Sequence, residues 1–339
     1  MMRSLLRLGW TSPLLAAFAW GVMLSSCATA VSIAPRAAVI PQLKKTHYVS
    51  YDGEEFGYRK WLPANTGQKA PSVVIIGVHG ISGHAGDYEN MAGYLLKHRE
   101  DVALYAAETR GQGMETRAKR RGDIRRVGQW YQDLATFTGL VRETHPGSKI
   151  VWFGESMGSL IVMHTYHHTG QELRPDAVAF SSPIIEVAAE LPRWKLWTAK
   201  FAALFFPKAR ISLESLSDGR STAVTREDNH AEQAAKNPWH IRRYTLRLLV
   251  KLGDLARSMD ERASSVTCPV LVLHGGKDFF TREDKVGDFC NNCDQSVRKT
   301  HHYYPGSYHL LMYDHQRDKI FGDIAAWLDQ FGDDQQTDK

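Results

Sequence analysis

Three side chains suited to nucleophilic catalysis occur in this 339-residue chain at positions 156, 278 and 309. Ser156 lies in the pentapeptide Gly-Glu-Ser-Met-Gly at 154–158, between two glycines that leave room for a sharp turn. A serine hydroxyl becomes a nucleophile when a base accepts its proton and an acid orients that base. We assign these roles to His309 and Asp278. The set predicts acyl transfer through a covalent serine intermediate.

Position along the chain selects these residues among many of the same type. His309 is one of 15 histidines, but it follows the last predicted strand, 301–304, and precedes the last predicted helix, 320–331. Asp278 follows the strand 270–274 in a Gly-Gly-Lys-Asp turn. The alternative interpretations are a serine that only forms a turn and an aspartate that only accepts backbone hydrogen bonds.

The elements around these residues alternate between strands and helices. The apolar strand 149–153 leads into Ser156, and a helix follows at 159–164. The other predicted elements are a hairpin of 45–51 and 56–62, strands at 73–78, 102–107 and 177–181, and helices at 88–99 and 127–143. Such alternation predicts a parallel sheet covered by helices on both faces. Sites in these sheets lie at the carboxyl ends of the strands, where all three side chains fall.

Backbone N–H groups that stabilise the oxyanion are predicted beside the serine. Met157 follows the nucleophile at a helix N-terminus, where the helix dipole favours negative charge. Ile81, in the turn after the strand 73–78, is the second candidate donor. Gly154 and Gly158 are assigned to the turn itself, because side chains there would clash with the neighbouring strand and helix.

Between residues 183 and 267 the alternation stops, and no clear strand is predicted. We interpret this segment as a helical cap that is inserted over the sheet. Trp194, Trp197, Phe201 and Phe205 recur there at helical spacing, with lysines elsewhere around the helix. An aromatic and basic amphipathic helix is typical of a membrane interface or an acyl-chain entrance. The alternative is a cap helix that packs on the core.

These motifs resemble those of the monoacylglycerol lipase and lysophospholipase group of serine hydrolases, which have the α/β-hydrolase fold. The resemblance spans about residues 45–332, cap included, and the order serine, aspartate, histidine is also that of α/β-hydrolases. The segments that carry it are 79–84, 110–113, 154–158, 269–278 and 306–309. It implies a serine esterase of single-chain lipid esters that needs no cofactor. Gln112 and Met114 stand where the group usually has histidine and serine, so the head-group preference stays open.

The N-terminus predicts export and a lipid anchor. A basic start precedes an apolar stretch at 14–23 that ends in Leu-Ser-Ser before Cys27. This pattern resembles the bacterial lipobox, in which the cysteine is acylated and becomes the new N-terminus. Ala28 is not the aspartate that often retains such proteins in an inner membrane, which favours an outer membrane if the cell has one. The alternatives are a simple cleaved signal and an uncleaved anchor.

The predicted domains are therefore a signal peptide at 1–26, a lipidated tether at 27–44, a hydrolase domain at 45–332 with its cap at 183–267, and a polar tail at 333–339. The composition, 43% hydrophobic and 23% charged, is that of a globular protein. The net charge of +5 is too small to indicate nucleic-acid binding. Six basic residues at 117–126 favour either anionic lipid binding or a solvated loop. The sequence predicts no oligomeric state.

The remaining cysteines favour a disulfide. Export implies an oxidising compartment, and Cys268 at the start of a strand would lie near Cys290 or Cys293 at the end of the following helix. The pairing is left open. Their spacing fits no standard zinc module, and we predict no metal site.

The main hypothesis is therefore hydrolysis of a monoacylglycerol or lysophospholipid ester, with a membrane surface as partner. A short-chain carboxylesterase or thioesterase is the first alternative. A lipid-binding lipoprotein without catalysis is the second, but such a protein would usually have lost a member of the triad. Ser156 argues against dehalogenases and epoxide hydrolases, which use a carboxylate nucleophile.

Overall fold

The computed structural model describes residues 39–67, 69–185, 193–212, 224–225, 237 and 239–331, with main chain only at 193–196. Cys27, the predicted signal peptide and the polar tail lie outside these residues, and so does the side chain of Trp194. Within the described part, no helix is long and apolar enough to cross a membrane.

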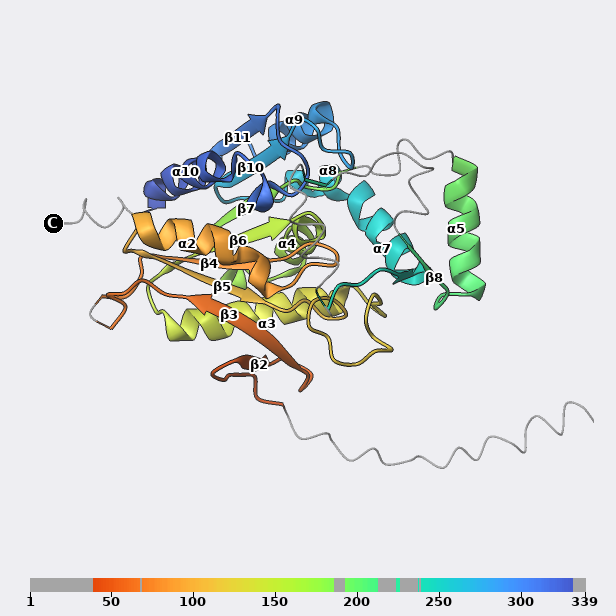
Figure 1. The fold of residues 1–339 in the computed structure, drawn as a ribbon, viewed down its shortest axis with the longest axis horizontal. Helices are drawn as coiled ribbons and strands as arrows, with labels where there is room; N and C mark the ends of the chain where they lie inside the picture. Colours follow the sequence, from red (N-terminus) through yellow and green to blue (C-terminus); the bar gives the residue numbers. More distant parts are fainter. Residues whose placement is uncertain are drawn as a thin grey trace, which may run out of the picture. The chain divides into compact units, whose positions relative to one another are not determined.

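A nine-stranded sheet forms the centre of the domain (Figure 1), in the order β1-β2-β3-β5-β4-β6-β7-β10-β11. The strands from β5 to β11 are mutually parallel, and β1, β2 and β3 join them antiparallel at one edge. The bounds are β1 Gln42–Leu43, β2 His47–Val49, β3 Glu55–Trp61, β4 Val73–Val78, β5 Val102–Ala107, β6 Lys149–Glu155, β7 Ala177–Ser181, β10 Val270–Gly275 and β11 Lys299–Tyr304. β1 lies within the stretch predicted as a tether.

Helices cover both faces of this sheet, as the alternation predicted. α2 (Glu89–His98) and α10 (Arg317–Leu328) pack on one face, while α3 (Gly128–Thr144), α4 (Met157–His168) and α9 (Glu283–Asn292) pack on the other. Each face of the sheet has its own hydrophobic core beneath these helices. Side chains of β4 alternate between the two cores, because neighbouring residues of a strand point to opposite faces. The α/β-hydrolase fold class is thus confirmed. The described part of the chain also contains short 3₁₀ helices, which are η1 Ala85–Tyr88, η2 Gln171–Leu173, η5 Leu311–Tyr313 and η6 Asp329–Phe331.

The described part of the cap contains α5 (Arg193–Phe205), α7 (Leu246–Arg257) and α8 (Met259–Ala263). α5 lies beside α7, and Lys200 pairs with Asp254 at 3.0 Å. The expectation of no clear strand was wrong, because β8 (Arg210–Ile211) pairs antiparallel with β9 (Tyr244–Thr245). Strands of two residues are too short to produce the alternating pattern by which a strand is recognised.

The predicted disulfide is also absent, since Cys268, Cys290 and Cys293 are free, buried thiols. The Cys293 thiol instead turns back along its own helix and donates to the Phe289 carbonyl oxygen at 3.5 Å. Burial raises the pKa of Cys268 and of Cys293 to about 12, so neither is a reactive thiolate near neutral pH. The described residues include no cluster of three side chains arranged to bind a metal.

Candidate active site

Ser156 occupies a sharp turn between β6 and α4. Its backbone has φ 53° and ψ −116°, a left-handed conformation that costs a non-glycine residue of order 1 kcal/mol or more. The flanking glycines make the turn possible. A Cβ on Gly158 would lie 1.8 Å from the Val78 carbonyl oxygen, and one on Gly154 would lie 2.6 Å from the Gly158 carbonyl oxygen. The close approach of backbone to backbone therefore requires both glycines.

The structure brings Ser156, His309 and Asp278 into one hydrogen-bonded chain. The distance from Ser156 Oγ to His309 Nε2 is 2.8 Å, and that from His309 Nδ1 to Asp278 Oδ2 is also 2.8 Å. Ser156 is 4% exposed and His309 3% exposed, so water competes little for these bonds. With its proton on Nδ1 facing Asp278, the imidazole presents a basic Nε2 to the serine.

A second carboxylate, not identified from the sequence, holds the loop that carries His309. Asp314 accepts hydrogen bonds from the Ser307 hydroxyl at 2.9 Å and from the Tyr308 N–H at 3.2 Å. On the other side, the Ser182 hydroxyl donates to the His309 carbonyl oxygen at 2.6 Å. These bonds fix the backbone on both sides of the imidazole, which limits its freedom to leave the serine.

Electrostatics favour the protonated state of His309. Burial opposes a charge on the imidazole, but the Asp278 carboxylate outweighs burial and raises the pKa of His309 above its ordinary value. Glu155, which directly precedes the nucleophile, raises that pKa further. The Glu155 side chain is itself buried, and burial raises its own pKa to about 7.

We therefore expect kcat/KM to fall with decreasing pH through the raised pKa of His309, because only the neutral imidazole accepts the serine proton. Replacing Glu155 with glutamine removes a negative charge near the imidazole and should lower the midpoint of this acid limb. The pH dependence of kcat/KM for a soluble ester gives this midpoint for the wild type and for Glu155→Gln. An unchanged or raised midpoint in Glu155→Gln would show that Glu155 carries no charge that His309 senses.

The two N–H groups predicted to stabilise an oxyanion belong to Met157, next to the nucleophile, and to Ile81, next to Gly80. Met157 begins α4, and Ile81 follows β4 in the loop 79–84, which we call the oxyanion loop. A Cβ on Gly80 would lie 3.3 Å from Ser156 Cβ, which shows how closely this loop approaches the serine. Neither the Ile81 nor the Met157 N–H has an acceptor in the described part of the chain. Both are therefore available to a substrate oxygen.

Glu108, also not identified from the sequence, joins the start of η1, directly after the oxyanion loop, to the turn after β5. Its buried carboxylate accepts the Ala85 N–H at 3.2 Å and the Met114 N–H at 2.9 Å. Gln112 is fully buried under the oxyanion loop, where its Oε1 accepts the Ser82 N–H at 3.4 Å. The glutamine that departs from the family pattern therefore supports the loop.

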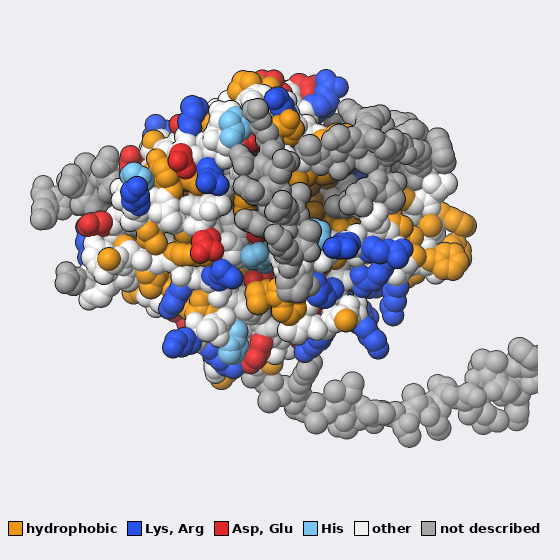
Figure 2. Space-filling view, in the orientation of Figure 1, with side chains coloured by type: hydrophobic (Ala, Val, Ile, Leu, Met, Phe, Trp, Pro, Cys, Tyr) orange, Lys and Arg blue, Asp and Glu red, His pale blue; other side chains and the backbone are white. Residues whose placement is uncertain are grey.

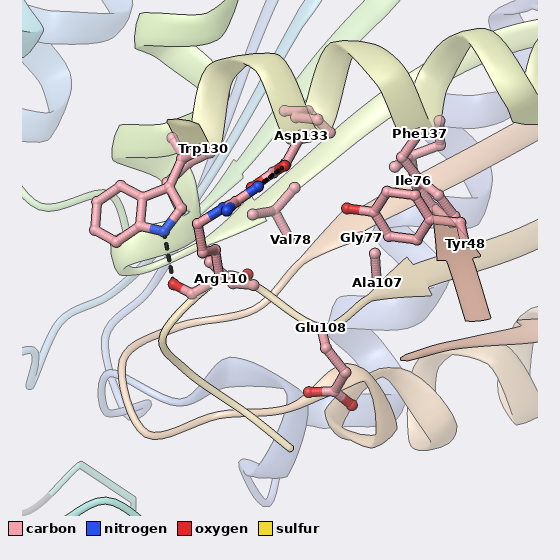
Figure 3. A pocket seen from close by; sticks show the side chains of 13 residues that line it. Tyr48, Ile76, Gly77, Val78, Ala107, Glu108, Arg110, Trp130, Asp133 and Phe137 are labelled. Atoms are coloured by element: carbon pink, nitrogen blue, oxygen red, sulfur yellow. Dashed lines mark hydrogen bonds and ion pairs between the residues drawn. The ribbon is translucent and has the colours of Figure 1, made fainter. Parts of the chain in front are cut away.

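A small cavity of about 30 Å³ lies behind this turn (Figure 3). Arg110 crosses it and forms two hydrogen bonds with Asp133 of α3, at 2.7 and 2.8 Å, while Trp130 donates to the Arg110 carbonyl oxygen at 2.9 Å. A volume of this size holds about one water molecule and no acyl chain. The cavity therefore lies among the residues that hold the turn after β5 in place, and it is not a substrate site.

The fold and the site together define a serine hydrolase of the lipase and esterase type. The chain belongs to the Hydrolase_4 family, described as serine aminopeptidase, S33, whose profile matches residues 69–316. It is 25% identical to a monoacylglycerol lipase of Mycolicibacterium smegmatis over 285 residues, 83% of this chain and 95% of that protein. It is 24% identical to human monoglyceride lipase over 304 residues, 86% of this chain and 92% of that protein.

Among solved structures, the domain is similar to a soluble variant of monoglyceride lipase from Saccharomyces cerevisiae in complex with a substrate analogue. The TM-score is 0.69 at 17% identity, and the match covers 88% of this chain and 98% of that one. At this level of identity the likeness supports the fold, while the catalytic assignment rests on the geometry of the site.

Proposed function

We propose that this protein hydrolyses carboxylic esters of single-chain lipids, monoacylglycerols or lysophospholipids, through an acyl-Ser156 intermediate. The observation that carries the proposal is the hydrogen-bonded chain of Ser156, His309 and Asp278, together with two nearby N–H groups, of Ile81 and Met157, that have no acceptor among the described residues. The substrate class is supported by the two monoacylglycerol lipase relatives, which extend over the cap as well as the sheet.

The reaction follows from the positions of the atoms. His309 Nε2 accepts the Ser156 proton as Oγ attacks the ester carbonyl carbon, and the Ile81 and Met157 N–H groups stabilise the oxyanion. The tetrahedral intermediate collapses when His309 returns that proton to the departing alcohol. This alcohol is glycerol for a monoacylglycerol and the glycerophospho head group for a lysophospholipid. Water then attacks the acyl-serine with His309 as base again, and the fatty acid leaves. Asp278 stabilises the imidazolium in both halves.

The test compares mono-oleoylglycerol, lyso-oleoyl-phosphatidylcholine, p-nitrophenyl butyrate and leucine p-nitroanilide as substrates of the wild-type protein and Ser156→Ala. Ser156-dependent release of oleate supports the proposal and ranks the two head groups. Activity confined to the butyrate ester would identify a short-chain carboxylesterase instead. Cleavage of the anilide alone would identify a peptidase, and no turnover of any compound would favour the non-catalytic lipid-binding alternative.

We also propose that the protein is exported, anchored through lipidated Cys27, and in contact with a membrane through α5. Trp197, Phe201 and Phe205 on this helix are 74%, 67% and 60% exposed, which is unusual for large apolar side chains. Figure 2 shows a concentration of lysine and arginine beside the apolar side chains over α5. Part of the 117–126 cluster is neutralised, since Arg117 and Arg120 pair with Glu54 at 2.6 and 3.0 Å.

Two sets of substitutions test this anchoring. Cys27→Ser should release the protein from the cell's membrane fraction, because two or three acyl chains anchor far more strongly than a surface helix. In the unlipidated chain, Trp197→Ser with Phe201→Ser should weaken binding to anionic vesicles at least tenfold, since burying a large apolar side chain contributes about 1.5–3 kcal/mol. Turnover of p-nitrophenyl butyrate should stay within about twofold.

Ile40→Ser is the matched control, because Ile40 is 72% exposed but lies outside the cap. Vesicle binding that survives the double substitution and disappears in high salt would assign the contact to the basic residues alone. A Cys27→Ser protein that stays in the membrane fraction would contradict the lipid anchor.

A further inference from the structure

The oxyanion loop is hydrogen-bonded to the cap through Ser82. The Ser82 hydroxyl lies 3.0 Å from the Ile241 carbonyl oxygen and is also hydrogen-bonded to the hydroxyl of Tyr244. The Tyr244 hydroxyl donates to the same Ile241 oxygen at 2.6 Å. Ser82 directly follows the candidate oxyanion donor Ile81, whereas the other two residues belong to the cap.

Ser82 has a backbone conformation that needs support. Its φ of 64° is in the left-handed region, which glycine adopts readily and serine does not. The restraint on its own N–H is long, at 3.4 Å to Gln112 Oε1. Among the described residues, the hydroxyl bonds to the cap are shorter than this restraint, so they hold Ser82 in this conformation and orient the peptide that precedes it.

The cap side of this contact is buried and hydrogen-bonded to the loop before α3. Tyr244 lies in β9 and is 1% exposed. The next residue, Thr245, donates from its N–H to the Gly122 carbonyl oxygen at 2.9 Å and from its hydroxyl to Asp123 Oδ1 at 2.7 Å. Burial raises the pKa of Tyr244 to about 12, so the phenol keeps its proton and remains a donor at neutral pH.

We propose that Tyr244 is a positioning residue that holds the Ile81 N–H in the oxyanion hole through Ser82, so that the contact of β9 of the cap with the oxyanion loop completes the catalytic site. The inference rests on the proposed hydrolase function and adds a coupling between the cap and the chemistry. The cap then contributes to the rate even for a small ester that makes no use of its apolar surface.

The expected effect falls on kcat, because the oxyanion exists only in the transition state and the intermediates. Loss of a complete oxyanion donor lowers the rate about 10²–10³-fold. Tyr244→Phe leaves the Ile81 N–H in the molecule but loosens it, so we expect kcat for p-nitrophenyl butyrate to fall about tenfold with KM changed less than twofold. Affinity for a trifluoromethyl ketone, which forms an oxyanion on Ser156, should fall in parallel.

Two further variants make the test specific. Ser82→Ala removes the other hydroxyl of the same contact, so the double variant with Tyr244→Phe should lose no more activity than the more impaired single variant. Tyr166→Phe is the matched control, because Tyr166 is also buried and its hydroxyl bonds Thr267. Thr267 lies just before β10, at the amino ends of the parallel strands and away from the catalytic site. Its kcat should stay within twofold of the wild type.

Amide hydrogen exchange of residues 79–84 gives a readout that needs no substrate. Tyr244→Phe should accelerate exchange in this loop several-fold, and Tyr166→Phe should not. Unchanged exchange and unchanged kcat in Tyr244→Phe, or additive losses in the double variant, would overturn the inference. Absence of any Ser156-dependent ester turnover in the wild type would instead contradict the proposed function, and the exchange rates would still decide the role of Tyr244.

Discussion

Replacing Ser156 with alanine is expected to lower kcat for every ester that the protein cleaves by on the order of 10⁶-fold, the loss typical of removing a nucleophile that acts together with its base. The reason is that His309 Nε2 lies 2.8 Å from the Ser156 hydroxyl and activates it for attack, whereas an alanine side chain offers no nucleophile in its place. Hydrolysis of p-nitrophenyl butyrate and of mono-oleoylglycerol under saturating conditions measures the effect.

The fold of this variant should be preserved. Alanine and serine meet the same backbone strain at φ 53°, so the thermal unfolding midpoint should change little. Ser181→Ala is a suitable control, because Ser181 is buried at the end of β7 beside the turn and its hydroxyl has no hydrogen-bond partner in the described chain. A Ser156→Ala protein with more than about 1% of wild-type activity would exclude the acyl-serine mechanism.

Asp278→Asn should lower kcat by about 10⁴-fold with little change in KM, because it imposes the wrong tautomer on His309. Asp278 accepts the Phe280 N–H at 2.7 Å with one oxygen and the His309 Nδ1–H at 2.8 Å with the other. The backbone N–H can only donate, so the asparagine oxygen must remain on Phe280 and its NH₂ must face His309. Nδ1 then becomes an acceptor, Nε2 carries the proton, and the base that Ser156 needs is lost.

The control for this substitution is Asp176→Asn. Asp176 likewise accepts a backbone N–H, that of Ile150 at 2.8 Å, but it lies near the start of β6 and β7, away from the catalytic end of the sheet. Its kcat should stay within about twofold of the wild type. An Asp278→Asn enzyme that keeps more than a tenth of its kcat would show that Asp278 does not set the tautomer.

Most of the sheet was predictable, because buried parallel strands are nearly continuous runs of apolar β-formers. The predicted bounds of β4, β5 and β7 coincide with those in the structure. The two-residue pair β8 and β9 was not predictable. Its two strands are separated by more than 30 residues, and β9 also bonds the loop before α3 through Thr245 and Gly122, so no local pattern records these contacts.

The sequence by itself determined the chemistry. A serine between glycines after an apolar strand, an aspartate after a later strand and a histidine before the last helix place these groups at one edge of a parallel sheet, because chain order and strand direction together define that edge. What only the tertiary structure decided is the support around them. Glu108 and Tyr244 act across separations of 23 and 162 residues, and Asp314 acts across seven, all through hydrogen bonds to backbone or hydroxyl groups. Such bonds depend on where folded segments meet, and many residue types can make them, so no spacing in the sequence identifies them.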